Sequence, residues 1–320
     1  MGDPETDVTV IIPTNQQALR LPMALAHLEV QSFPSARFEV FIAEYGKEAP
    51  NSGAETSVLQ RYCTGAPMRV RHIFGYANRA QACNAALEEA RGRTVLFLDE
   101  DVLASPTLVE AHAELHANST EPKAVVGRIE FHPQTDPRAF TYPKETDSLA
   151  RYRIESDTGY IDWRLLHVSY PMAYFQQAGF FDESPALAGL EDVELGWRMM
   201  QAGVRGHFAD DIFALTWRTS SIKRERNRAY LEGYALHALE DRTGIANLLP
   251  RIAGESIQPY FLRAMYVPLS TLISPLLAAN TRLYQSLLHG IMYYDMQHGY
   301  RDARSGLMPE PPTLKPINLV

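Results

Sequence analysis

The sequence predicts an α/β fold, with a mostly parallel sheet flanked by helices and a helical C-terminal extension. Short apolar segments alternate with segments of helical periodicity from the N-terminus to Val102, an order that is typical of parallel sheets. The chain has 320 residues, of which 46% are hydrophobic, so it is long enough and apolar enough to bury a large core. Beyond Ser220 the alternation stops and helical patterns predominate.

Strands are expected where short runs of apolar, β-prone residues lie between turn residues. In the first part of the chain these runs are residues 7–13, 38–43, 68–74 and 94–102, and further on they are 124–131, 204–208 and 212–216. The polar segment 132–163 shows no clear period. A long loop is therefore expected there, of the kind that is either functional or disordered.

Helices are expected where apolar residues recur at helical spacing, as Leu21, Leu25 and Leu28 do. The expected helices are residues 20–31, 57–63, 80–90, 106–117, 174–178 and 191–202. Gly92 is expected to cap the helix 80–90 at its C-terminal end. The helix 191–202 carries acidic residues in its first turn and has Gly203 directly after it, which are typical start and stop signals.

Composition narrows the class of protein and its expected location. The formal net charge is −8, which argues against a general nucleic-acid binder. Two cysteines, Cys63 and Cys83, are too few for a disulfide framework, and no zinc-type spacing occurs. The acidic, polar start of the chain does not read as a secretory signal. We expect a cytoplasmic protein, with the inner face of the membrane as an alternative, peripheral location.

The C-terminal region begins with basic residues and continues with an uncharged segment. Residues 264–281 contain no charge, but Pro268 and Pro275 interrupt them, so a clean membrane span is not expected. We expect helices that pack on the body of the protein or on a second subunit in a homodimer. The alternative is contact of residues 257–300 with a membrane surface.

Two aspartates follow one of the predicted strands. Asp99 and Asp101 end the apolar run that begins at Thr94, and on an extended chain this spacing places both carboxylates on one face. Ligands of open α/β sheets bind outside the carboxyl ends of the strands. Mg²⁺ and Mn²⁺ take oxygen ligands and often share them with a substrate diphosphate. We therefore predict a site for a divalent cation, with Asp101 as the main ligand and Asp99 beside it.

Five sequence blocks follow one another between Val8 and Trp217. They are Ile11-Ile12-Pro13-Thr14, then Gln31 with the segment Phe38–Glu44, then Asn84, Gly92 and Phe97–Asp101, then Gly179–Glu183, and finally Gly189–Arg198. In this order the blocks resemble the family 2 glycosyltransferases. The resemblance implies a GT-A fold and the inverting transfer of a sugar from a nucleotide-sugar, preferably a UDP-sugar, to a hydroxyl acceptor. It also implies assistance by Mn²⁺ or Mg²⁺, while GDP and dTDP stay open as alternatives to UDP.

The resemblance extends to individual donor-site residues. The donor-binding residues that it and the residue chemistry suggest are Pro13, Thr14, Glu44, Tyr45, Asn84, Asp99, Glu100 and Arg224, and the metal ligands are Asp101 and Asp99. Glu44 would accept hydrogen bonds from the base or the ribose, and Tyr45 would stack on the base. Arg224 belongs to a basic cluster that would add positive charge near the diphosphate; the alternative for this cluster is a solvated helix face.

Glu191 and Asp192 are the predicted catalytic residues. A carboxylate near a helix N-terminus is a simple general base for the acceptor hydroxyl, and the resemblance assigns this role to Asp192. Glu191 is expected to hold Asp192 in place or to bind the acceptor. Attack from the face opposite the leaving group would invert the anomeric centre. The competing interpretation is that both residues only balance the helix dipole.

The sequence departs from the family pattern in three places. The glycine and arginine that are common before the family's asparagine appear here as Ala80 and Cys83. Glu44-Tyr45-Gly46-Lys47 stands where the family usually has Asp-Asp-Gly-Ser, and Thr216-Trp217 stands where a histidine often follows the late strand. Each of the ten histidines is interpreted as a structural or surface residue rather than as a ligand. These departures keep open the hypothesis of a non-catalytic nucleotide-binding or sugar-binding relative.

A haloacid-dehalogenase-like phosphatase is the other alternative. Asp99-Glu100-Asp101-Val102 fits the nucleophile motif of that class, and Asp210-Asp211 would supply its later acid pair. However, the nucleophile strand of such phosphatases normally opens the domain, and the helix that begins with Glu191 and Asp192 would have no role in it.

We expect four parts along the chain. Residues 7–103 are the nucleotide-sugar-binding half and 104–219 the acceptor-binding and catalytic half of one GT-A domain; 220–305 form a helical region and 306–320 a flexible tail. The acceptor is expected to be a glycan, a lipid-linked sugar or a small natural product that carries a hydroxyl group.

Overall fold

A computed structural model describes residues 6–15, 20–46, 54–134, 159–217, 222–246, 248 and 282–309 of the chain. The chain divides into two compact units. The first comprises Met1–Pro133, Lys144–Glu183 and Leu195–Arg218, and the second comprises Gln134–Pro143, Ser184–Glu194 and Thr219–Val320. Within the described residues, no helix is long and apolar enough to cross a membrane.

The first unit contains an eight-stranded sheet in the order β3-β2-β1-β4-β7-β6-β8-β5. The strands are β1 (Val8–Thr14), β2 (Phe38–Tyr45), β3 (Arg69–Tyr76), β4 (Thr94–Leu98), β5 (Val102–Ala104), β6 (Lys123–Phe131), β7 (His167–Pro171) and β8 (Arg205–Thr216). The strands β3, β2, β1 and β4 are all parallel, as are β6 and β8. The short β7 and β5 are antiparallel to their neighbours. The α/β fold with a mostly parallel sheet is confirmed.

The helices also agree with the expected segments, apart from shifts at their ends. They are α1 (Leu21–Glu29), α2 (Ala54–Gly65), α3 (Arg79–Glu89), α4 (Leu108–Asn118), α6 (Ala173–Ala178), α7 (Glu191–Gln201), α8 (Ile222–Thr243) and α11 (Arg282–Arg304), with short 3₁₀ turns η1 (Ser35–Arg37), η3 (Tyr160–Asp162) and η4 (Pro185–Leu187). Residues of α1, α2 and α4 share one buried cluster with Val8, Val10 and Ile12 of β1. Because alternate strand residues face opposite sides, these three helices cover one face of the sheet.

Three expectations about local structure are wrong. β4 ends at Leu98, and Asp99 to Asp101 form a tight turn in which the Val102 N–H donates to the Asp99 carbonyl at 3.1 Å; the two aspartates therefore do not share a strand face. The predicted strands 204–208 and 212–216 are one strand, β8, with a bulge opposite β6. Ala90, not Gly92, is the C-cap of α3.

Gly92 has a different role, which is to let two backbone segments approach closely. A Cβ atom at this position would lie 2.3 Å from the backbone nitrogen of Thr9 in β1. The Gly92 N–H instead donates to the Thr9 hydroxyl at 2.9 Å.

The uncharged segment 264–281 lies outside the described residues, as does the tail beyond residue 309.

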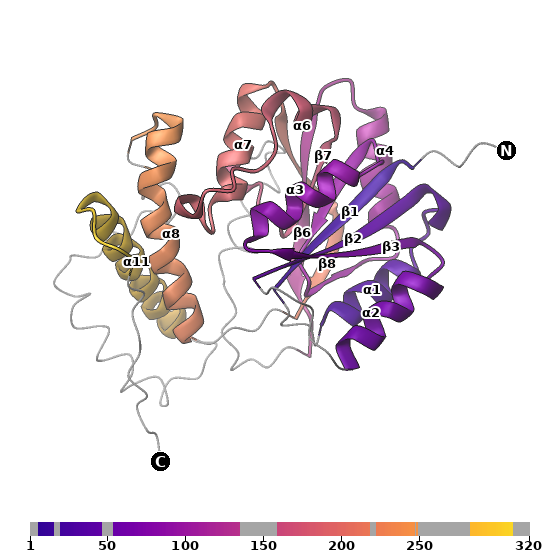
Figure 1. The fold of residues 1–320 in the computed structure, drawn as a ribbon, viewed down its shortest axis with the longest axis horizontal. Helices are drawn as coiled ribbons and strands as arrows, with labels where there is room; N and C mark the ends of the chain where they lie inside the picture. The colour runs from indigo at the N-terminus through magenta and orange to yellow at the C-terminus, as the bar shows by residue number, and fades with distance from the viewer. Residues whose placement is uncertain are drawn as a thin grey trace, which may run out of the picture. The chain divides into compact units, whose positions relative to one another are not determined.

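The second unit contains α8 and α11, which lie side by side (Figure 1). Arg226 of α8 donates two hydrogen bonds to the Asp295 carboxylate of α11, at 2.7 and 2.9 Å. The Asp295 side chain is 1% exposed, and burial raises its pKa even though the guanidinium acts in the opposite direction. The pair is thus an internal ion pair rather than part of a solvated basic face.

Removal of one partner of this pair is expected to destabilise the second unit strongly. Asp295→Ala leaves the Arg226 guanidinium buried without a counter-ion, which typically costs about 3–5 kcal/mol. The midpoint of thermal unfolding should fall well below that of the wild type, while Asp241→Ala, at an exposed position, should change it little. The double variant Arg226→Met/Asp295→Leu should recover most of the loss, and a single variant as stable as the wild type would contradict the interpretation.

Three histidines form a hydrogen-bonded cluster between α4 and β7, in which His112 and His167 are buried and His116 is partly buried. Nδ1 of His112 lies 2.8 Å from the Ser169 hydroxyl, and Nε2 of His112 lies 2.9 Å from Nε2 of His167. Nε2 of His116 lies 2.7 Å from the same Ser169 hydroxyl. Burial lowers the pKa of His116 and of His167 to about 4 and that of His112 well below its usual range. All three are therefore neutral at pH 7.

This cluster predicts a loss of stability in mild acid. Between pH 6.5 and 4 the unfolded chain binds protons that the folded cluster does not, so the free energy of unfolding falls as the pH is lowered through this range. One pKa unit corresponds to about 1.4 kcal/mol. Denaturation midpoints measured from pH 7.5 to 4.5 should fall, and should fall less steeply for His116→Gln. A profile that is flat over this range would refute the prediction.

Candidate active site

Six of the predicted donor-site residues lie at the carboxyl ends of β1, β2 and β4 in the first unit, whereas Asn84 lies on α3 and Arg224 on α8 of the second unit. Thr14 is the last residue of β1 and pairs in the parallel register with Glu44, which lies one residue before the end of β2. The turn Asp99–Asp101 follows β4, the other neighbour of β1. Parallel strands bring their carboxyl ends to one edge of a sheet, where ligands of such folds bind. The sequence thus brings these side chains to one place through strand order.

The turn after β4 is fixed by its own hydrogen bonds. The Asp99 N–H donates to the Leu166 carbonyl at 3.1 Å, and Asp99 Oδ1 accepts the Glu100 N–H at 2.8 Å. The Thr14 hydroxyl donates to the Glu100 carboxylate. The end of β1 therefore holds Glu100, and Glu100 helps to hold the turn.

Asp101 is buried, with 8% of its surface exposed, and polar groups surround it. Its Oδ1 accepts the Thr216 hydroxyl at 3.2 Å, and its Oδ2 lies 3.5 Å from Nη1 of Arg20. The Trp217 N–H donates to the Asp101 carbonyl at 3.3 Å. Thr216 and Trp217, which replace the family's usual sequence here, thus position Asp101 from the end of β8.

The chemistry of this turn fits a divalent cation that is shared with a ligand. No group of three or more His, Cys, Asp and Glu side chains that could hold a metal occurs within the described ranges. Mg²⁺ in particular is usually held by one or two carboxylates together with substrate phosphates and water. Asp101 and Asp99 are two carboxylates on one turn and are the candidate ligands for such a cation.

Glu44 has one carboxylate oxygen in use and one unpaired. The side chain is 3% exposed; Oε2 lies 2.8 Å from Nε2 of His72 in β3, and Oε1 is buried without a hydrogen-bond partner among the described residues. Buried polar atoms are rarely left unpaired, so this oxygen is a candidate acceptor for a ligand N–H or O–H group. The sequence motifs did not indicate His72 as a partner of Glu44. His72 lies opposite Ile42 in the β2–β3 register, a position that is known only once the strands are paired.

Asn84 joins two of the sequence blocks. Its Oδ1 accepts the Phe181 N–H at 2.9 Å, and its Nδ2 donates to the Phe181 carbonyl at 3.0 Å and to Glu183 Oε1 at 2.8 Å. The amide therefore holds the Phe181–Glu183 segment against α3. Contact of Asn84 with a donor stays a prediction, next to this structural role.

Arg198 fixes the residues directly before this segment. It donates to the carbonyls of Ala178, Gly179 and Phe180, with 3.1 Å to Gly179 and 2.7 Å to Phe180. Gly179 has a φ of 83°, which favours glycine because side chains with a Cβ atom rarely adopt it. This is why a glycine and an arginine flank the Phe-Asp-Glu turn.

Glu191 and Asp192 lie in the second unit, at the start of α7. Glu191 Oε2 accepts the Gly189 N–H at 2.6 Å, and Asp192 Oδ1 accepts the Val193 N–H at 2.9 Å. They are 5% and 1% exposed. Both carboxylates thus lie at the positive end of the helix, where Glu191 caps the preceding turn through the N–H of Gly189.

The basic cluster at the start of α8 separates into different roles. Arg226 is used in the buried pair with Asp295, and Arg228 lies 3.1 Å from Glu225 and 3.8 Å from Glu232. Arg224 is exposed. Its proposed contact with the diphosphate stays a prediction.

The acid pair required by the phosphatase alternative lies elsewhere. Asp210 and Asp211 are exposed in the middle of β8, and Asp210 is 3.7 Å from Arg128. Both aspartates lie in the bulge of β8, and Trp217, whose N–H contacts Asp101, lies four residues beyond Phe213, roughly 13 Å further along the strand. The turn after β4 therefore lacks the second acid pair.

Comparisons with known proteins agree with this arrangement. The model of the family described as "Glycosyl transferase family 2" matches residues 9–182, more than half of the chain. Validoxylamine A glucosyltransferase of Streptomyces hygroscopicus subsp. jinggangensis is 28% identical over 229 residues, 62% of this chain and 52% of that protein. YfnE of Bacillus subtilis, an uncharacterized glycosyltransferase, is 28% identical over 255 residues, 65% of this chain and 64% of that protein. The chain thus matches about half to two thirds of the length of these relatives.

Two solved structures share the fold. The mannosyltransferase PcManGT from Pyrobaculum calidifontis, in complex with GDP-Man and Mn²⁺, has a TM-score of 0.61 and 17% identity, covering 94% of this chain and 88% of that one. Residues 1–349 of S. aureus TarS, in complex with UDP-GlcNAc, have a TM-score of 0.51 and 14% identity, and the match covers 95% of this chain and 93% of that one.

Proposed function

This chain belongs to glycosyltransferase family 2, and on that premise we propose that it transfers a hexose from a nucleotide-sugar to a hydroxyl acceptor, with inversion and with help from a divalent cation. The observation that carries the proposal is the turn Asp99–Asp101 at the carboxyl end of β4, beside the ends of β1 and β2. UDP is the preferred nucleotide on the basis of the Asp-x-Asp motif. One structural relative binds UDP-GlcNAc and another GDP-Man, so both nucleotides belong in the test.

Donor binding is assigned to the strand ends of the first unit. The unpaired Oε1 of Glu44 would accept a hydrogen bond from the base or the ribose, and Tyr45 would stack on the base. Pro13 and Thr14 end β1 beside them, and Thr14 holds Glu100. Glu100 and Asn84 then support the donor pocket, Glu100 through the turn and Asn84 through the Phe181–Glu183 segment.

The cation would be held by Asp101 with Asp99, as Mn²⁺ or Mg²⁺. When bound it supplies positive charge to the diphosphate as the bond to the sugar breaks. Thr216 keeps Asp101 Oδ1 oriented at 3.2 Å, and Arg20 lies 3.5 Å from Oδ2. Both contacts restrict the rotation of this carboxylate, which a shared metal site requires.

Asp192 is assigned the role of general base. It would accept the proton of the acceptor hydroxyl while that oxygen forms a bond to the anomeric carbon and the bond from this carbon to the diphosphate breaks. The carboxylate is 1% exposed, and Oδ1 is held by the Val193 N–H. Glu191, bonded to the Gly189 N–H at 2.6 Å, positions the start of the helix that carries Asp192.

Release of nucleoside diphosphate from UDP-, GDP- and dTDP-hexoses, with Mn²⁺ and with EDTA, tests this function. Release from one donor that stops in EDTA is the expected result. Nucleotide binding without release in the presence of acceptor extracts would favour the non-catalytic relative. Release of inorganic phosphate from an aryl phosphate, with no turnover of any nucleotide-sugar, would contradict the proposal.

A further inference from the structure

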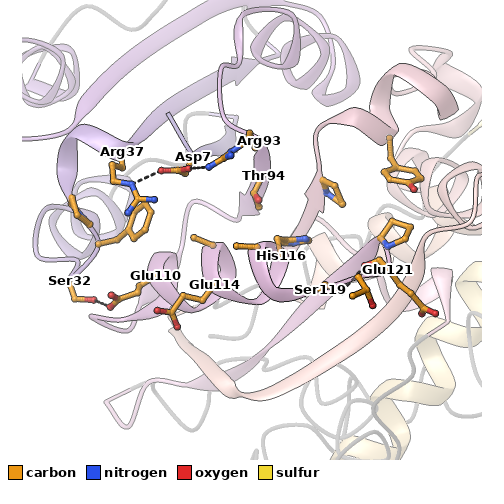
Figure 2. Close-up of a pocket in the computed structure, with 18 residues that line it drawn as sticks. Asp7, Ser32, Arg37, Arg93, Thr94, Glu110, Glu114, His116, Ser119 and Glu121 are labelled. Atoms are coloured by element: carbon orange, nitrogen blue, oxygen red, sulfur yellow. Dashed lines mark hydrogen bonds and ion pairs between the residues drawn. The ribbon is translucent and has the colours of Figure 1, made fainter. Parts of the chain in front are cut away.

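A pocket of about 730 Å³ lies in the first unit (Figure 2). Its lining includes residues at the amino ends of β1 and β4, the ends opposite those that carry the donor residues. Asp7 precedes β1, Arg93 precedes β4, and the segment Ser119–Pro122 leads into β6. Thr14, at the far end of β1, is seven residues from Asp7, or roughly 20 Å along the strand. The pocket is therefore separate from the proposed donor site.

One wall of the pocket consists of a carboxylate held between two guanidinium groups. Asp7 accepts hydrogen bonds from Arg37, at 2.6 Å, and from Arg93 (Figure 2). Partial burial acts to raise the pKa of Asp7, but the two arginines hold it below its usual value. The side chains of Arg37 and Arg93 are 50% and 67% exposed, so this wall presents N–H donors.

The facing wall comes from α4 and presents acceptors. Glu110 and Glu114 project from this helix, as does His116, and Glu121 follows it (Figure 2). Glu110 accepts the Ser32 hydroxyl at 2.5 Å, whereas the carboxylate of Glu114 is exposed. His116 is neutral at pH 7 because burial lowers its pKa to about 4.

These walls select the chemistry of a ligand. The lining of the pocket carries four carboxylates and two guanidinium groups. Its net negative charge disfavours the binding of nucleotides and other polyanions. The polar lining disfavours a purely apolar ligand. A simple cation would satisfy only the α4 wall and would be repelled by the arginines. Sugar hydroxyls both donate and accept hydrogen bonds, so a neutral oligosaccharide satisfies both walls at once.

Apolar residues complete the fit. Pro122, Pro171 and Tyr174 line the pocket together with the polar groups, and such surfaces pack against the C–H faces of sugar rings. The volume lies within the usual range for small-molecule sites. We propose that this pocket is a second carbohydrate-binding site, specific for neutral oligosaccharides, distinct from the proposed donor site.

Saturation-transfer difference NMR of the full chain with maltotriose, cellotriose and N,N′,N″-triacetylchitotriose, all neutral, tests the proposal. The samples contain EDTA and no nucleotide. Ala117→Trp places an indole in the pocket from an exposed position on α4, and Asn118→Trp makes a similar change one residue later, at an exposed position that does not line the pocket. At least one trisaccharide should bind, and Ala117→Trp should weaken it about tenfold or more while Asn118→Trp does not.

Three results would overturn the proposal. They are the absence of binding by all three trisaccharides, binding that Ala117→Trp leaves unchanged, and binding of spermidine that Ala117→Trp abolishes while no sugar binds. Circular dichroism of both variants checks that the fold is kept. Because neither nucleotide nor metal is present, the outcome is independent of whether the protein turns over a nucleotide-sugar, so each proposal can fail alone.

Discussion

Asp192→Asn is expected to lower the rate of sugar transfer by about 10²–10⁴-fold, the usual contribution of a general base. Asparagine keeps an oxygen for the Val193 N–H, which Asp192 Oδ1 accepts at 2.9 Å, but it cannot take a proton from the acceptor. Affinity for the nucleotide should not change, because this residue is assigned to the acceptor side. Release of nucleoside diphosphate under saturating donor gives the rate, and calorimetry gives the nucleotide affinity.

The matched control is Asp241→Asn, at a side chain that is 74% exposed in the same unit. It should retain full activity. If Asp192→Asn also retained full activity and only lowered the unfolding midpoint, the carboxylate would serve the helix dipole alone. A loss of activity with a normal midpoint would support its role as a base.

The second large effect is expected for Asp101→Asn. The variant removes a carboxylate that is assigned to the cation, so affinity for UDP in the presence of Mn²⁺ should fall by at least the 10–100-fold that loss of an outer-shell partner costs. Affinity in EDTA should stay close to that of the wild type. Isothermal titration in both conditions measures the two values.

Asp210→Asn is the control for this experiment, because its side chain is 48% exposed on β8 and lies away from the turn. It should bind the nucleotide as the wild type does. Equal affinity of Asp101→Asn and wild type in Mn²⁺ would remove the metal role from this residue. The fold and the family would stand unaffected by that result.

Much of the fold could be predicted from local patterns. Apolar runs located the strands of the parallel part of the sheet, and the spacing of Leu21, Leu25 and Leu28 located α1. The antiparallel β7 was not predicted, because its pairing with β4 and β6 joins segments far apart in the sequence. The sequence predicted one continuous strand over residues 94–102. In the structure the pairing of β4 with β7 stops at Leu98 opposite His167, so Asp99 and Asp101 lie on a turn.

The site was predicted better in its residues than in its contacts. Glu44 and Asp101 do lie at strand ends, but their partners His72 and Thr216 come from strands whose neighbours the sequence does not reveal. For Arg226 the predicted environment was wrong. The sequence placed it in a cluster of basic residues, interpreted as a solvated helix face or as positive charge on a loop. In the structure it pairs with the buried Asp295, which is 69 positions away. His112 and His116 are four residues apart on α4, so their side chains share one face of the helix. This spacing could have predicted that the two histidines lie together, and we did not use it.

The most direct test of the central claim is the unfolding midpoint of the protein with UDP, GDP, dTDP or CDP, each with Mn²⁺, with Mg²⁺ and with EDTA. A ligand that binds only the folded state at a hundredfold excess over its dissociation constant adds about 2.7 kcal/mol of stability. We predict that one nucleotide raises the midpoint, and that it does so only with a cation present. No rise with any nucleotide under any of these conditions would contradict a donor site at the ends of β1, β2 and β4.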